Sequence, residues 1–465
     1  MRLSIFLMLM SAVFICGCEQ SYPLYPHSSE PVKLTPPQKL SESSPGTSPA
    51  VIPDKPIDLR QSIGIGLANN PGLSAAAWDT ETAQAEQDIA KAELLPRLNA
   101  VSGYTHYLDS QRLVPVSGPG QSGSFSNDIF SGDLVLTMPF FTAGRLQNQV
   151  KARDFFLMST EHRLVRTRQE LVFNISSVFY SILTQRKVIE SLEFSQKALA
   201  EHRWRVKQLI EAQKAAQVDL LRTEVRLADI EQKLISERNT LDIQHSVLAE
   251  LLGVENRRIE ITGQLQSEPS KIDVQQGLWK AYAQRPDLKS TESELKAQDR
   301  LVDYAKAQHW PEIDLQAAYG GRWSAGSVTG GNSTSGDVGS VGVLLTLPIF
   351  EGGRIDATIR REKSRLNAAQ QRARALKLRI QREVQSAASS VESTFARVQT
   401  TEKSIEQAEE SLRIESQKYE LGKGTIVDVL DSQAALLEAQ TNYYRVLAEY
   451  NIAVAQWVLV TGESI

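Results

Sequence analysis

The feature of this sequence that most restricts its fold is an internal repeat that runs through almost the whole chain. Tyr104 in the first half matches Tyr319, and Leu136 matches Leu345 at a slightly shorter spacing. The spacing changes where we expect a loop, since loops tolerate differences in length. A repeat of this kind predicts two structural units of the same build. The matching segments are residues 70–73 and 285–288, 95–98 and 310–313, 136–141 and 345–350, and 218–221 and 427–430.

Each half contains the same series of predicted elements. A helical stretch covers residues 71–95 in the first half and 286–310 in the second. Each stretch should end there because a proline follows, and the residue before proline disfavours helical backbone angles. Two strands come next, separated by a polar loop rich in Gly and Ser at 109–127 and at 324–336. The sequence therefore predicts helices and strands within each half.

Two long stretches without glycine or proline follow the strands, at residues 145–252 and 354–421. Their richness in Ala, Glu, Gln, Arg, Lys and Leu is typical of long helices. We expect turns at 213–217 and 422–425, so that a shorter helix returns alongside each long one. Two registers of apolar residues seven apart indicate a coiled-coil-like seam, with a generic helical bundle as the alternative. They are Leu157, Leu164, Leu171 and Val178, and Ile175, Ile182 and Ile189.

The predicted strands alternate apolar and polar residues. In the second strand of each half one parity is apolar, at Leu134, Leu136 and Met138 and at Val343, Leu345 and Leu347. Alternation with aromatic ends is typical of lipid-facing barrel strands. Four strands cannot close a barrel by themselves, since known barrels begin at about eight. Side chains would fill an eight-stranded interior, so an open lumen predicts three or more chains that share one barrel.

Charge and composition exclude several classes of protein. The net charge is -4, with 51 basic and 55 acidic residues, which gives no basic footprint for nucleic acid. The six histidines are scattered without metal-ligand spacing, so we predict no metal site and no cofactor. No cluster of catalytic groups is evident, and we predict that the protein is not an enzyme.

The N-terminus predicts the destination of the protein. Arg2 precedes an apolar run, residues 3–14, that is too short for a transmembrane helix and is typical of a signal peptide. Residues 15–18 then resemble a bacterial lipobox, in which Cys18 would be lipidated and become the mature N-terminus. A plain secretory signal with chance cysteines is the alternative. The Pro- and Ser-rich residues that follow should form a tether, because they cannot bury enough apolar surface to fold.

With these features in place, the chain resembles the TolC-like outer-membrane efflux proteins, in particular their OprM-like lipoprotein branch. The most specific stretch is residues 419–431, Tyr-Glu-Leu-Gly-Lys-Gly-Thr-Ile-Val-Asp-Val-Leu-Asp, and Leu436, Gln440 and Tyr443 continue the pattern. The resemblance implies an α+β membrane protein in which duplicated antiparallel helices form a periplasmic tunnel. It also implies four transmembrane strands per chain in a twelve-stranded barrel shared by a homotrimer.

The resemblance further implies a division of the chain and a set of partners. We expect a signal peptide at 1–17, a lipidated tether at 18–56, a first efflux repeat at 57–253, an equatorial linker at 254–284 and a second repeat at 285–465. The protein would lie in the bacterial outer membrane, anchored in lipid through Cys18, and extend into the periplasm. It would export substrates from an inner-membrane pump, of the resistance-nodulation-division class, through a periplasmic adaptor.

The family's gate gives candidate site residues. Asp428 and Asp431 match aspartates that line the periplasmic constriction, and their spacing places them on one helix face. Asp428 could instead cap a helix with Thr425. Tyr419 matches a gate tyrosine, with a core aromatic as the alternative. The first-half mates, Asp219 and Arg222, could pair with each other. The helix tips that would contact the adaptor are Leu421, Gly422, Lys423, Gln213 and Lys214.

The first tip departs from the family pattern, because residues 212–215 contain no glycine. This leaves the docking of the adaptor at that tip open. A lipid-anchored trimeric coiled-coil tether or adhesin is the rival interpretation, although it does not explain the paired strands. The cargo stays open among drugs, metal ions, peptides and proteins, and no Met- or His-rich stripe favours metal.

Overall fold

The computed structural model describes residues 55–115, 123–213, 215–255, 258–265, 268–324, 329 and 335–463. Cys18, the predicted signal peptide and nearly all of the predicted tether lie outside these residues, as does Lys214.

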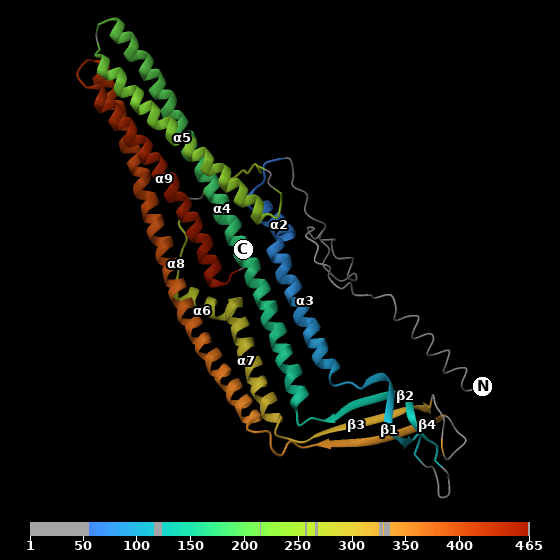
Figure 1. Cartoon of the computed structure of the whole chain (residues 1–465). Coiled ribbons are helices and arrows are strands. Elements are labelled where there is room, and N and C mark those ends of the chain that lie inside the picture. The colour runs from blue at the N-terminus through green and yellow to red at the C-terminus, as the bar shows by residue number, and fades with distance from the viewer. Residues whose placement is uncertain are drawn as a thin grey trace. The chain divides into compact units, whose positions relative to one another are not determined.

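The predicted repeat is confirmed by the order and the ends of the elements (Figure 1). The first half comprises α2 (Leu59–Asn69), α3 (Pro71–Ala92), β1 (Arg97–Arg112), β2 (Phe125–Phe141), α4 (Arg145–Glu211) and α5 (Gln217–Leu251). The second comprises α6 (Val274–Gln284), α7 (Pro286–Ala307), β3 (Glu312–Ser324), β4 (Ser335–Thr346), α8 (Arg354–Glu420) and α9 (Ile426–Thr461). The helices before the strands, α3 and α7, are 22 residues each and begin at matching prolines; we call them the lateral helices. The long helices after the strands, α4 and α8, are 67 residues each and begin at matching arginines.

The lateral helices α3 and α7 end slightly earlier than the prolines predict. After Ala92 the backbone N–H groups of Leu94 and Leu95 donate to carbonyls three positions back, and His309 and Trp310 do the same at the end of α7. This tighter hydrogen bonding is the usual form of a last helical turn. The prolines therefore limit each helix, and its final turn narrows before the proline is reached.

In each half, the two shorter helices pack along the long helix. Helix α4 packs against both α3 and α5, and the amide of Asn70 at the start of α3 donates to the carbonyl of Leu251 at the end of α5, at 2.9 Å. In the second half, Arg285 before α7 donates to the carbonyl of Val460 near the end of α9. Segment 254–284 contains α6, which packs on α8 and α9, and Ile261 of this segment pairs with Ile57.

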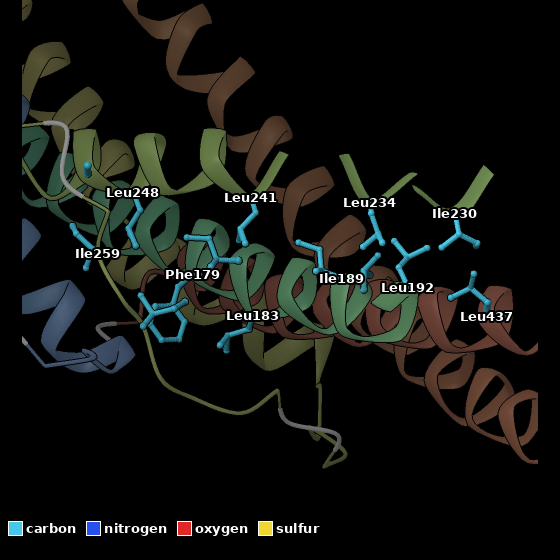
Figure 2. Close-up of a cluster of buried hydrophobic side chains, with 14 of the residues drawn as sticks. Phe179, Leu183, Ile189, Leu192, Ile230, Leu234, Leu241, Leu248, Ile259 and Leu437 are labelled. Carbon is cyan, nitrogen blue, oxygen red and sulfur yellow. The ribbon is translucent and has the colours of Figure 1, made fainter. Parts of the chain in front are cut away.

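The main core lies where α4, α5 and α9 meet (Figure 2). Ile189 of α4 points toward Leu234 of α5, and Leu437 of α9 belongs to the same cluster. The ring of Phe179 lies beside Gly263 of the linker segment. The predicted seam is confirmed in one register: Ile175, Ile182 and Ile189 are buried, whereas of the other register only Leu171 is buried. No described helix has the combination of length and hydropathy that spanning a bilayer requires.

The four strands form one antiparallel sheet in the order β1-β2-β3-β4. Leu98 pairs with Leu136, Leu134 with Tyr319, and Leu315 with Val343. Since directly paired residues lie on the same face of a sheet, the predicted apolar parities share one face. The other face carries the hydrogen-bonded pair Arg322 and Asp133, whose N–O distance is 2.7 Å. The predicted alternation is thus confirmed across all four strands.

The sheet is open at both sides. Among the described residues, β1 and β4 each pair with a strand on one side only, and β1 is exposed along its whole length. An unpaired strand edge is a template for another strand. The apolar face is exposed too, at Leu98, Tyr319 and Val343. Unpaired strand edges and an exposed apolar face are both expected of a sheet that forms part of a larger one.

Candidate functional site at the helix turns

The turn between α8 and α9 is stabilised by a glycine in the left-handed conformation and by backbone hydrogen bonds. Gly422 has a φ of 69°, in the left-handed region that favours glycine. The N–H groups of Lys423 and Gly424 both donate to the carbonyl of Lys418, at 2.8 and 3.1 Å, and so close the end of α8. Leu421 is left 71% exposed at the outermost point of the turn. The second tip therefore presents an apolar side chain on a rigid turn.

At the end of α4, before α5, a residue other than glycine takes the left-handed conformation. Gln213 has a φ of 57° and occupies the place that Gly422 takes in the second half. A residue other than glycine is strained in this region. The N–H of Gln213 still donates to the carbonyl of Ile210, at 2.9 Å. The missing glycine thus changes the chemistry of the first tip, while Gln213 keeps the left-handed conformation of Gly422.

Asp428 caps the helix in which it lies. Its carboxylate accepts hydrogen bonds from the hydroxyl of Thr425 at 2.6 Å and from the backbone N–H of Thr425 at 3.1 Å. The backbone N–H of Asp428 donates to the Thr425 hydroxyl oxygen in return, which completes a capping box. The hydrogen bonds from Thr425, the hydroxyl first, lower the pKa of Asp428 below its ordinary value. In the first half, the carboxylate of Asp219 likewise accepts from the N–H of Ala216.

Asp431 joins two helices of the chain. Its carboxylate is 3.2 Å from Nη2 of Arg226, which lies on α5. Asp428 and Asp431 both lie outside the core, while Val429 and Leu430 between them are buried. The two aspartates therefore share an exposed side of α9, and Asp431 links α9 to α5.

Tyr419 lies against the core at the end of α8. Its ring centroid is 5.6 Å from that of His202 on α4, and it packs against the buried cluster of α4, α5 and α9. Burial, and then the charge of Asp219, raise the pKa of Tyr419. Burial also lowers the pKa of His202. The position agrees with the interpretation of Tyr419 as a core aromatic, and the contact links the end of α8 to α4.

A groove of about 430 Å³ lies between α5 and α9 beside the turns. It is lined by the apolar Leu221, Val225 and Val427 and by the charged Arg226 and Asp431. Near the ends of α4 and α8, Nη1 of Arg205 is 3.5 Å from Oε1 of Glu420. Arg205 and Arg226 could not be identified from the sequence, because nothing in their local sequence marks them among many other arginines. Figure 1 shows the two turns at the same end of the helices.

The sequence matches the family described as outer membrane efflux protein over residues 63–254 and 278–463. The chain belongs to this efflux family. The family consists of outer-membrane transport proteins, so this efflux protein is an outer-membrane channel protein and not an enzyme. The two matched stretches also correspond to the two halves of the repeat.

Individual relatives agree with this assignment. The efflux protein is 25% identical to a probable outer membrane lipoprotein, SilC, of Salmonella typhimurium, over 97% of both chains. It is 22% identical to the outer membrane protein TolC of Escherichia coli, over 83% of this chain and 78% of TolC. Its fold is similar to the crystal structure of the Campylobacter jejuni CmeC outer membrane channel, with a TM-score of 0.77 and 16% identity over 87% of this chain and 85% of CmeC.

Proposed function

We propose that three copies of this efflux protein form the outer-membrane duct of a tripartite efflux or secretion system. Each copy contributes four strands to one twelve-stranded barrel and its long helices to a periplasmic tunnel. The observation that carries the proposal is the open sheet with one exposed apolar face. Only helices and closed barrels satisfy their backbone groups in lipid, so a sheet with two free edges requires neighbours in order to enter a bilayer.

The length of the helices supports the periplasmic part of the proposal. Helix α4 has 67 residues, which at about 1.5 Å per residue extends roughly 100 Å from the sheet to its turn. The turns are then the entrance of the duct. There Asp428 and Asp431 line the constriction, six carboxylates in three copies, and Tyr419 holds the entrance closed by tying α8 to α4.

We further propose that the chain divides as its sequence predicts. A signal peptide at 1–17 is removed, Cys18 carries the lipid, and residues 18–56 form the tether. The repeats are 57–253 and 285–465, with the linker 254–284 as a belt around the duct. The printed description of SilC as a lipoprotein supports the lipid anchor. Leu421, Gly422, Lys423, Gln213 and Lys214 would contact a periplasmic adaptor, and a pump of the resistance-nodulation-division class would supply the cargo.

Two measurements test the proposal. Native mass spectrometry of the detergent-extracted protein should give three times the mass of the mature chain. Planar-bilayer recordings should give single-channel currents from the same preparation. The rival, a lipid-anchored coiled-coil tether, also gives a trimer and does not conduct. A monomer, or a trimer without conductance in the bilayer, would refute the duct.

A further inference from the structure

The helices next to the sheet have an order that leaves two edges free. Helix α3 packs on α4, α4 on α7, and α7 on α8 (Figure 1). Only Ala90 of α3 is buried, while Trp78 and Ile89 are 52% and 63% exposed. Because α3 leads into β1 and β4 leads into α8, each free helix edge lies on the same side as a free strand edge. The chain thus has an α3–β1 edge and an α8–β4 edge.

The two halves of the chain are joined by the contact between α4 and α7. The hydroxyls of Ser159 on α4 and Ser290 on α7 are 2.8 Å apart, and both residues are buried. Arg163 of α4 forms an ion pair with Glu294 of α7. Strands β2 and β3 continue the same junction into the sheet. In this junction the long helix of one half packs against the lateral helix of the other half.

The repeat places matching residues on the two free edges. When α4 is aligned with α8 from their first arginines, the counterparts of Ser159 and Arg163 are Ala368 and Arg372. When α7 is aligned with α3 from their first prolines, the counterparts of Ser290 and Glu294 are Ala75 and Asp79. Small residues thus correspond to small residues, and the basic and acidic residues of the ion pair keep their signs. Unlike Ser159 and Ser290, however, all four counterparts are exposed.

The two helices that carry the free edges also have net charges of opposite sign. Helix α3 has four acidic residues and one lysine, a net charge of -3. The matching first part of α8, 354–375, has seven basic and two acidic residues, a net charge of +5. Among the described residues, no ion pair or side-chain hydrogen bond engages the charged groups of Asp79, Glu81, Arg372 or Arg374. Charges of this kind fix partner and register at helical interfaces.

We propose that the α8 edge of one copy binds the α3 edge of the next copy in the geometry of the α4–α7 junction. Arg372 then pairs with Asp79 of the partner subunit, and Ala368 packs against Ala75 of the partner subunit. The contact joins two different surfaces, and three such contacts close into a ring when each rotates the next copy by one third of a turn. The inference rests on the proposed trimer and adds the residues and charges that hold it together.

Cross-linking tests the geometry. A chain with both Ala75→Cys and Ala368→Cys should give covalent trimers under mild oxidation, because facing Cβ atoms approach to within disulfide reach. The matched control pairs Ala77→Cys, which lies on another side of α3, with Ala368→Cys and should stay uncross-linked. The unmodified chain reports any contribution of Cys16 and Cys18. A trimer by native mass spectrometry that cross-links equally in both variants would refute this seam and leave the trimer standing.

Charge reversal tests the energetics. Asp79→Arg and Arg372→Asp should each raise the fraction of monomer by roughly tenfold, as like charges now face each other, and the two together should restore the trimer. Asp88→Arg is the control, since its counterpart Asp303 pairs with neighbours on its own helix and not with α4. If the unmodified chain is monomeric, the proposed function fails. If it is trimeric and the double reversal does not restore assembly, only the seam fails.

Discussion

Arg285 offers the sharpest test of how the second half of the chain is held together. Its side chain is 2% exposed, and its guanidinium donates to Asp287 at 2.6 Å and to Glu383 at 2.8 Å. It also donates to the carbonyl of Val460. One side chain therefore joins the start of α7, the middle of α8 and the end of α9. We expect Arg285→Met to keep much of the volume and remove all of these bonds.

The magnitude follows from what the substitution leaves behind. Removing one member of a buried ion pair costs about 3–5 kcal/mol, because the remaining charge stays buried without a partner. The carboxylates of Asp287 and Glu383 are 24% and 29% exposed, so water hydrates them in part. We therefore expect the lower end, about 3 kcal/mol, or roughly 100-fold in the equilibrium constant for opening this junction.

The sign of the pH dependence provides a second measurement. Burial favours the protonated form of Asp287, but the hydrogen bonds and charge of Arg285 outweigh it and hold the pKa of Asp287 below its ordinary value of 3.8. This stabilisation is present above pH 3.8 and is lost as the pH falls through the lowered pKa. Without Arg285, the pKa of Asp287 should rise relative to the parent protein, because burial is then opposed only by the charge of Arg166 and the N–H of Leu288. The deficit of the Met variant should therefore shrink as the pH is lowered from neutral toward the acid range.

The repeat supplies a matched control for the assay. The counterparts of Arg285, Asp287 and Glu383 in the first half are Asn70, Gly72 and Asn174, all uncharged. The triple variant Arg285→Asn, Asp287→Gly, Glu383→Asn should recover stability relative to Arg285→Met, because no buried charge is left alone. Urea unfolding followed by helical circular dichroism compares the three proteins. A Met variant within about 0.5 kcal/mol of the parent protein would refute the reasoning.

Three further predictions concern other parts of the chain. His245 is 3% exposed, and burial, followed by the charges of Arg186 and Arg258, lowers its pKa below 6.5. The stability of the protein should therefore fall as the pH drops below 6.5. His245→Leu should weaken this pH dependence, measured as urea midpoints above and below pH 6.5. Equal slopes would contradict this. Asp428→Asn with Asp431→Asn should reduce cation preference and block by trivalent cations in bilayer recordings; unchanged selectivity with lower stability would leave Asp428 a helix cap. Cys18→Ser should abolish incorporation of labelled fatty acid, and undiminished labelling would exclude Cys18 as the anchor.

The positions of the helices and strands could be read from the sequence because local rules govern them. Stretches without glycine or proline became α4 and α8, and the prolines at 96 and 311 limited the lateral helices. The alternation at Leu134 and Val343 set the faces of the strands, since side chains alternate strictly along a strand. The repeat doubled each of these signals, so that a weak pattern in one half was supported by its counterpart.

The partners of the charged side chains were decided only by tertiary structure. Arg226 pairs with Asp431 from another helix, and Arg285 pairs with Glu383 in the same way. The contact of His202 with Tyr419 likewise joins distant parts of the sequence. No local periodicity encodes such pairs, because they depend on how far each helix rotates and slides against its neighbour. Asp219 and Arg222, by contrast, are neighbours on one helix, yet the carboxylate of Asp219 accepts from the start of its own helix.

The turn at Gln213 illustrates the same division. The repeat predicts a turn at 213–217, although its sequence lacks the glycine that marks the second turn. The fold imposes the left-handed conformation on Gln213 all the same, with a φ of 57°. The sequence by itself thus determined where each helix ends, and packing between helices decided which backbone conformation joins them.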